Sequence, residues 1–185
     1  MPLKKLSASV KTDKKEKEYP WKEGDIVIHG NDGICRITGI RAENLVGEGL
    51  RDYYILVPLY NSSLTIYVET DGAEETLRRP MGEDEIRSVI AAIPTMEMEW
   101  IRDEKERHRI LQEKLRDPKV GELIPVIRAL YRKKQEVLGK GKKFHSADEQ
   151  ILNRAETIVN RELAHGLGID PDKVPGYIQR IVEGS

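Results

Sequence analysis

Alternating hydrophobic and polar residues in the first part of the chain predict short β-strands. The expected strands cover residues 26–29, 34–41, 52–57 and 64–68, and turn residues at 31–33 and 61–63 separate them. Four or five short strands within about 50 residues are typical of a small, strongly bent barrel. Gly39 falls inside one of these strands and predicts a β-bulge that helps to close the barrel.

The hydrophobic period changes to that of an α-helix from residue 83 onward. Asp117 and Pro118 have the types of an N-cap and a first helical residue, and Pro125 predicts a kink or a later start. Ser146 and Glu149 have the spacing of a capping box. The expected helices cover 83–93, 96–116, a segment from 118 that includes 120–131, a segment from 146 to the glycines at 166–168, and 170–182. Their apolar stripes predict a bundle, so the fold class is α+β, with a small N-terminal β-barrel followed by a C-terminal α-helical bundle.

Charge is segregated along the chain, although the formal net charge is only −1. Residues 100–143 carry 14 basic and 7 acidic side chains, net +7, whereas residues 19–80 carry 6 basic and 10 acidic ones, net −4. Residues 1–18 carry 6 Lys and 3 acids, net +3, and are predicted to be a disordered basic tail. The predicted domains are therefore this tail, a barrel domain at 19–75 and a helical domain at 83–185. The basic block is a candidate for phosphate contact, although a solvated helical face of mixed charge has the same composition.

The sequence contains no recognisable catalytic constellation and no signature of a cofactor site. Its four histidines are scattered, and we find no Cys or carboxylate partner for them at a metal-binding spacing. We therefore expect a protein without enzymatic activity, bound metal or cofactor. The one cysteine, Cys35, excludes an intramolecular disulfide and favours a reducing cytoplasm. No apolar run is long enough for a signal peptide or a membrane span.

Trp100 stands out because it lies among charged residues, where an exposed indole is costly. On the expected helix, Arg102, Lys105 and Arg109 share one stripe, and further basic patches follow downstream. Such cations can follow DNA phosphates, and an apolar ring beside them can wedge between base steps of distorted DNA. The candidate DNA-contact residues are Trp100, Arg102, Lys105, Arg109, Arg128 and Arg132. The alternative is that Trp100 only packs between bundle and barrel.

Several short motifs follow one another in a fixed order. They are Gly24-Asp25-Ile-Val-Ile-His29 with Gly33 after it, Tyr54-Ile-Leu-Val57, Leu64-Thr-Ile-Tyr-Val68, Trp100, Val126-Ile-Arg-Ala-Leu-Tyr-Arg132 and Ile158-Val-Asn-Arg-Glu-Leu-Ala164. This order, over about residues 20–165, resembles the CarD/CdnL family of bacterial RNA polymerase-binding transcription regulators.

The resemblance implies a Tudor-like or SH3-like RNA polymerase interaction domain, similar to that of transcription-repair coupling factors, which binds the lobe of the polymerase β-subunit. It also implies a helical domain that touches promoter DNA at the upstream edge of the transcription bubble. There Trp100 would insert at the minor groove and help to hold the open complex. Arg102 and Lys105 fall on basic positions of the family, whereas a third basic position falls on Glu149.

The polymerase contact is expected at an edge strand, because a partner strand can extend such an edge. The candidate contact residues are Tyr54, Leu64, Ile66, Tyr67 and Val68, with the two tyrosines as anchors or as ordinary barrel residues. Two positions at which the resemblance leads us to expect arginine are Glu43 and Tyr67 here. This difference favours an altered polymerase surface or weaker binding.

The sequence therefore predicts a transcription regulator that binds RNA polymerase and promoter DNA but no membrane. It is expected to be a monomer when free, and to be cytoplasmic and associated with the nucleoid through the polymerase. The alternative is a protein-interaction adaptor in which the barrel binds a peptide and Trp100 is structural.

Overall fold

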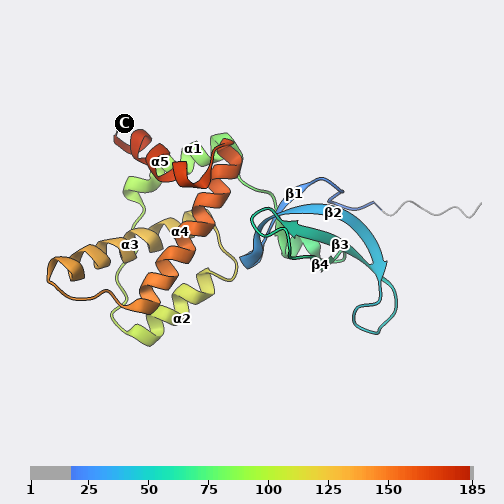
Figure 1. The fold of residues 1–185 in the computed structure, drawn as a ribbon, viewed down its shortest axis with the longest axis horizontal. Coiled ribbons are helices and arrows are strands. Elements are labelled where there is room, and N and C mark those ends of the chain that lie inside the picture. Colours follow the sequence, from blue (N-terminus) through green and yellow to red (C-terminus); the bar gives the residue numbers. More distant parts are fainter. Residues whose placement is uncertain (1–17, 184–185) are drawn as a thin grey trace, which may run out of the picture.

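A five-stranded antiparallel sheet forms the first half of the molecule (Figure 1). The computed structural model describes residues 18–183, so nearly all of the predicted tail at 1–18 lies outside the described residues. The strand order is β4-β3-β2-β1-β5. The strands are β1 (Ile26–His29), β2 (Gly33–Glu43), β3 (Arg51–Pro58), β4 (Ile66–Glu69) and β5 (Leu77–Arg78).

The sheet bends around a small apolar core that includes Val27, Ile37 and Leu56. The register of β2 against β3 shifts between Ile37 and Gly39, which confirms the predicted bulge. The outer strands β4 and β5 each pair on one side only, so the described sheet is a partly open barrel. The sequence did not predict β5, because two residues carry no alternation and the strand exists only through its pairing with β1.

Helices make up the second half of the molecule, with α4 running through its centre (Figure 1). The helices are α1 (Glu83–Ala92), α2 (Glu104–Lys114), α3 (Val120–Gly139), α4 (Ser146–Leu167) and α5 (Val174–Glu183). Their apolar stripes share one core, in which Leu111, Leu123 and Leu163 are at most 1% exposed. The predicted class, α+β with a barrel-like sheet followed by helices, is confirmed.

The start predicted for α3 and the capping box predicted for α4 are wrong, although α4 begins at Ser146 as expected. The N-cap of α3 is Lys119 rather than Asp117, and the N-cap of α4 is His145 rather than Ser146. Neither N-cap makes a side-chain capping bond, so neither helix has the capping contact that the sequence predicted. Pro125 lies inside α3 without ending it.

The predicted helix over 96–116 is wrong in its first half, since residues 96–103 are not helical. The α2 helix begins at Glu104, and the side chain of Asp103 caps it by accepting from the Glu106 N–H at 2.8 Å. Two arginine side chains donate to backbone carbonyls in this segment and just before it. Arg128 donates to the carbonyls of residues 93, 94 and 96, and Arg107 donates to that of Ile101 at 3.0 Å.

The sheet and the helices meet along α4. Arg78 of β5 donates two hydrogen bonds to Glu162 of α4, at 2.7 and 2.8 Å, and a third to the Pro118 carbonyl at 2.9 Å. The linker after β5 crosses α4 at Gly166, where an added Cβ would lie 2.5 Å from the Met81 carbonyl oxygen. Among residues 18–183, no helix combines the length and apolar character that crossing a bilayer requires.

Candidate nucleic-acid interface

Trp100 lies half-buried at the surface of the helical domain, in the extended segment before α2. Its ring packs against the helical core and contacts two cations. The Cζ atom of Arg107 is 4.5 Å from the ring centroid, and the Nζ atom of Lys133 is 5.5 Å from it. Cation–π contacts of this kind fix the plane of an indole without enclosing it. The arrangement therefore holds Trp100 in one orientation and leaves part of the ring exposed.

Arg107 belongs to a buried polar network that the sequence did not reveal. Its guanidinium donates to both oxygens of Asp148, at 3.0 and 2.9 Å, and Asp148 is 2% exposed. The Nε2 atom of His108 lies 3.1 Å from the same carboxylate. A buried bidentate ion pair is rigid, and this one fixes α2 to α4 beside Trp100. Sequence reasoning missed this network because Arg107 and Asp148 are 41 residues apart.

A groove of about 650 Å³ opens beside the Trp100 ring. Met98 and Ala129 are among its apolar lining residues. Its positively charged lining residues are Arg102, Arg132 and Lys133, and its negatively charged ones are Glu97, Glu99 and Glu136. The groove therefore has as many acids as cations and is not strongly basic. Its capacity to bind a phosphate depends on which of the cations have no acidic partner.

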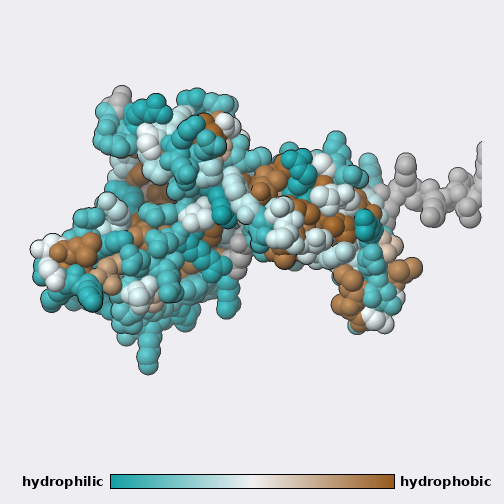
Figure 2. All heavy atoms as spheres, in the orientation of Figure 1, coloured by the Kyte–Doolittle hydropathy of each residue, from teal (hydrophilic) through white to brown (hydrophobic). Residues whose placement is uncertain are grey.

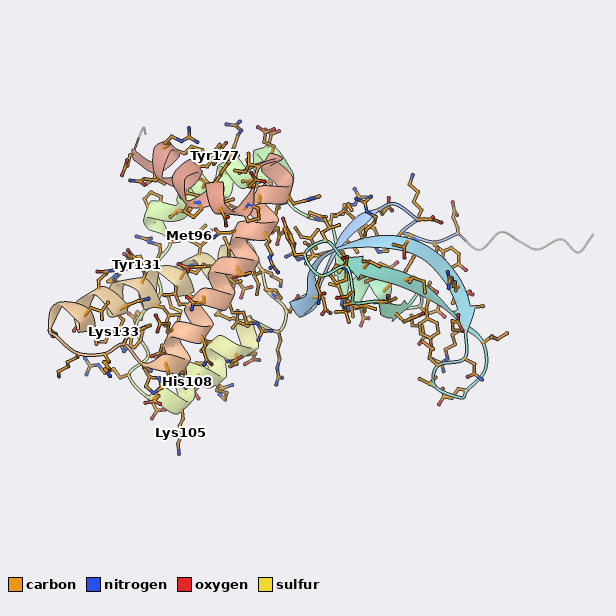
Figure 3. All side chains as sticks on the ribbon, viewed as in Figure 1. Met96, Lys105, His108, Tyr131, Lys133 and Tyr177 are labelled. Carbon is orange, nitrogen blue, oxygen red and sulfur yellow. The ribbon has the colours of Figure 1, made fainter. Side chains whose placement is uncertain are left out.

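Most cations of the basic block are paired with acids. Arg132 lies 3.4 Å from Glu97, and Arg109 lies 2.7 Å from Glu106. Within the described part of the chain, Arg102 and Lys105 are exposed and have no ion-pair partner. Figure 3 shows Lys105 projecting from α2 away from the bundle. Among the described residues of the block, five exposed cations are unpaired in this sense: Arg102, Lys105, Arg116, Lys142 and Lys143.

Arg128 has a different position from the one expected of a DNA contact. It is half-buried, and its Nη1 atom donates to the carbonyls of residues 93, 94 and 96. A guanidinium used in this way fastens the extended segment to α3. We therefore treat Arg128 as an anchor of the segment that carries Trp100 and leave it out of the proposed DNA contacts.

Glu149, in the first turn of α4, has a partner in Lys134 of α3. The two side chains form an ion pair at 2.7 Å, which joins α3 to α4. The hydrogen bond from Lys134 to Glu149 raises the pKa of the lysine above its ordinary value. An acid at this position, where the family resemblance implies a basic residue, thus has a structural role.

The β4 strand is an outer strand of the sheet and pairs only with β3. Tyr67 is 42% exposed and Leu64 is 39% exposed, while Ile66 and Val68 pack partly on the sheet core. An outer strand with free backbone groups and an exposed aromatic side chain can accept a further strand. The structure thus brings four of the five predicted polymerase-contact residues to one edge.

Tyr54, the fifth of these residues, is fully buried. Its hydroxyl accepts a hydrogen bond from the Trp21 backbone N–H at 3.3 Å, and its ring meets Tyr19 edge-on at a centroid distance of 6.2 Å. Burial raises the pKa of Tyr54. The expectation of Tyr54 as a surface anchor is wrong in this fold, because its place in β3 points the ring into the core.

The hairpin between β2 and β3 carries an exposed apolar tip that sequence reasoning overlooked. Figure 2 shows hydrophobic colour there, and Leu45, Val46 and Leu50 are 52%, 62% and 75% exposed. Glu43 is the last residue of β2 and pairs in register with Arg51 at the base of this loop. A run of exposed large aliphatics in a loop is the signal that could have marked it.

Two histidines that looked scattered in the sequence lie side by side. The ring centroids of His108 and His145 are 5.4 Å apart, and His145 lies 3.1 Å from Glu104. The sequence analysis found no carboxylate partner for a histidine at a metal-binding spacing, but the fold brings Glu104, His108 and His145 together. Cys35 lies elsewhere, in the core of the sheet, where burial and the charge of Asp32 raise the pKa of its thiol to about 12.

The bent sheet with a free edge and the helical domain with an aromatic and cationic groove define a two-domain binding protein. Comparison with known families agrees with this class. Residues 21–81 match the model of the CarD-like/TRCF RID domain, and residues 88–179 match that of the CarD C-terminal domain. The two matches cover most of the chain, which therefore belongs to the CarD family of transcription regulators that interact with RNA polymerase.

Proposed function

We propose that the protein binds the lobe of the RNA polymerase β-subunit through its sheet and stabilises the promoter open complex through Trp100 at the upstream edge of the bubble. The observation that carries this proposal is the Trp100 ring, held in a fixed plane by Arg107 and Lys133 and partly exposed beside a groove. An oriented and accessible indole can stack against a base at a junction, where the bases are already parted.

The cations around Trp100 suit a backbone contact. Arg102 lines the same groove, and Lys105 projects from α2 (Figure 3). Neither pairs with an acid of the described chain, so contact with a phosphate would require no ion pair to be broken. Arg132 and Arg109 would first have to leave Glu97 and Glu106. We therefore assign the main phosphate contacts to Arg102 and Lys105 and secondary ones to Arg109 and Arg132.

The proposed polymerase contact is the outer edge of β4, with Leu64, Ile66, Tyr67 and Val68. Strand addition supplies affinity through backbone hydrogen bonds, and the exposed Tyr67 ring supplies apolar area. The apolar tip at Leu45, Val46 and Leu50 lies on the neighbouring hairpin and would enlarge this surface. With these partners, we expect the protein to act in the cytoplasm, at the nucleoid, as a non-enzymatic factor.

The test is the lifetime of the open complex with the Trp100→Ala protein. Stacking of a base on an aromatic side chain is worth about 1–3 kcal/mol, so the lifetime should fall roughly five- to hundredfold. Co-purification with RNA polymerase should not change. The matched control is Tyr131→Ala, which removes a 54% exposed ring that does not line the groove. An unchanged lifetime with Trp100→Ala would remove the proposed wedge.

One observation favours the adaptor as a second candidate, namely that Trp100 also packs against the helical core. If the ring only docks the extended segment, Trp100→Ala lowers the melting temperature and the isolated protein binds forked and duplex DNA equally well. A stable Trp100→Ala protein with weaker preference for forked DNA would exclude this candidate.

A further inference from the structure

We propose that Glu104, His108 and His145 form a binding site for a divalent transition-metal ion of the zinc class. One ligand atom of each residue lies within 4.8 Å of the others. The three come from two elements, because Glu104 and His108 are one turn apart on α2 and His145 is the N-cap of α4. The site was hidden in the sequence because His108 and His145 are far apart along the chain, with the whole of α3 between them.

The donor set has the composition that zinc prefers. Two imidazoles and one carboxylate are a frequent zinc set that leaves a fourth position open to water. Magnesium and calcium prefer oxygen ligands throughout, and copper(I) prefers sulfur. Ligand atoms around tetrahedral zinc are roughly 3.3 Å apart, given bonds of about 2.0–2.1 Å. The ligand atoms of the three residues lie within 4.8 Å of one another, so they would have to move closer together to bind zinc. The side chains of Glu104 and His145 are 57% and 46% exposed and are free to make this movement.

Asp148 contacts one of the three proposed ligands, His108, and holds its ring in place. Its carboxylate lies 3.1 Å from Nε2 of His108 and is itself held by both donors of Arg107. A ring that donates from Nε2 keeps the lone pair of Nδ1 free for an ion, which is the carboxylate–histidine–metal arrangement of many zinc proteins. Asp148 is 2% exposed, so this support is rigid.

The local charges also favour a cation. Glu104 and Asp148 are acidic, and Arg107 compensates only the second of them. An ion at this site would join the first turn of α2 to the start of α4, next to the network that holds Trp100. It would thereby stiffen the helical domain where the proposed DNA contact lies.

The experiment is calorimetric titration of Zn²⁺ into the untagged, chelator-treated full chain at about pH 7.5, where free imidazole is largely neutral. We expect saturable binding of one equivalent, and no comparable binding of Mg²⁺. His145→Ala and Glu104→Gln should each raise the Kd for zinc at least about tenfold. His165→Ala, in the last turn of the same helix, is the matched control and should bind zinc as the parent does.

A second readout is the nitrogen spectrum of the four histidine rings. Zinc should shift the ring signals of His108 and His145 and leave those of His29 and His165 in place. His108→Ala also removes a hydrogen-bond partner of Asp148, so a loss of zinc binding in that variant would have two explanations. His145 is exposed, and His145→Ala therefore tests the zinc site without disturbing Asp148. Absence of saturable zinc binding by the parent, or equal zinc affinity of the parent and His145→Ala, would overturn the site.

Discussion

Glu136 decides how much positive charge the Trp100 groove offers. Its carboxylate pairs with Lys140 at 2.6 Å and with Lys133 at 3.0 Å. These two hydrogen bonds lower the pKa of Glu136 to about 2, so the acid remains ionised over the whole working range of the protein. One acid thereby compensates both Lys133, which lies beside Trp100, and Lys140. The balance of the groove thus depends on single residues rather than on the overall charge of the helical domain.

Salt dependence of DNA binding tests this balance. Replacing Arg102 and Lys105 by Ala should reduce the slope of log K against log salt concentration by about one unit for each phosphate that the variant no longer neutralises. Glu136→Gln should act in the opposite sense, because it releases Lys133 and Lys140, and its effect should be constant between about pH 6 and 8. The measurement is fluorescence anisotropy with forked DNA at several salt concentrations.

Lys173→Ala is the control for this series, because Lys173 is 71% exposed and pairs with Asp170, away from the groove. Its slope should equal that of the parent. If the Arg102 and Lys105 variant also keeps the parental slope, these residues do not contact phosphate.

At the level of elements, the extended segment at 96–103 is the decisive local structure. It interrupts what the sequence presents as one helix, and it places Trp100 outside helical geometry. Arg128 holds the start of this segment and Arg107 holds its end, each through backbone carbonyls. A segment fixed at both ends presents its side chain at a defined angle, as a wedge requires.

Arg128→Met tests this anchoring, since methionine keeps an apolar stem but removes the donors. Loss of charge-assisted hydrogen bonds at a half-buried site should lower the free energy of unfolding by about 1–3 kcal/mol. Amide hydrogen exchange at residues 96–103 should become faster. Arg87→Met is the matched control, because Arg87 is 55% exposed on α1 and pairs with Glu83 outside the segment, and it should change stability by less than about 0.5 kcal/mol. Equal exchange rates in both variants would contradict the anchoring.

At the level of the whole molecule, the pair of Arg78 and Glu162 connects the sheet to the helices. Glu162 is 2% exposed, and the hydrogen bond that it accepts raises the pKa of Arg78. An ion pair with a nearly buried acid is a stiff joint, since losing one partner leaves the other charge poorly solvated. The proposed polymerase edge and the proposed DNA contact lie on opposite sides of this joint (Figure 1).

Glu162→Gln is therefore expected to lower the free energy of unfolding by about 1–3 kcal/mol, reduced from the fully buried case because Arg78 is 31% exposed. Open-complex lifetime should fall with it, while polymerase binding remains. Glu83→Gln breaks an exposed pair with Arg87 and should leave the urea midpoint nearly unchanged. The measurement is urea denaturation of both proteins, and equal midpoints would show that the joint contributes nothing to stability.

Local patterns in the sequence predicted the elements that depend on local physics. The four main strands follow from alternation and turn residues, and the bulge beside Gly39 follows from a glycine within a strand. The helical core follows from apolar stripes at helical spacing. Trp100 was recognised as unusual because an indole among charges is costly wherever the chain folds.

The sequence by itself thus determined the α+β class, the order of sheet and helices and the residue on which the proposed function rests. Only the tertiary structure decided that Tyr54 is buried, that residues 96–103 are extended and that His108 meets His145. Each of these depends on groups distant in the chain. Arg128 and Arg107 donate to backbone carbonyls in and just before the extended segment, β3 turns Tyr54 inward, and α4 brings Asp148 to α2. Contacts of that range leave no periodic trace in a sequence, because they depend on how the elements pack rather than on how each one forms.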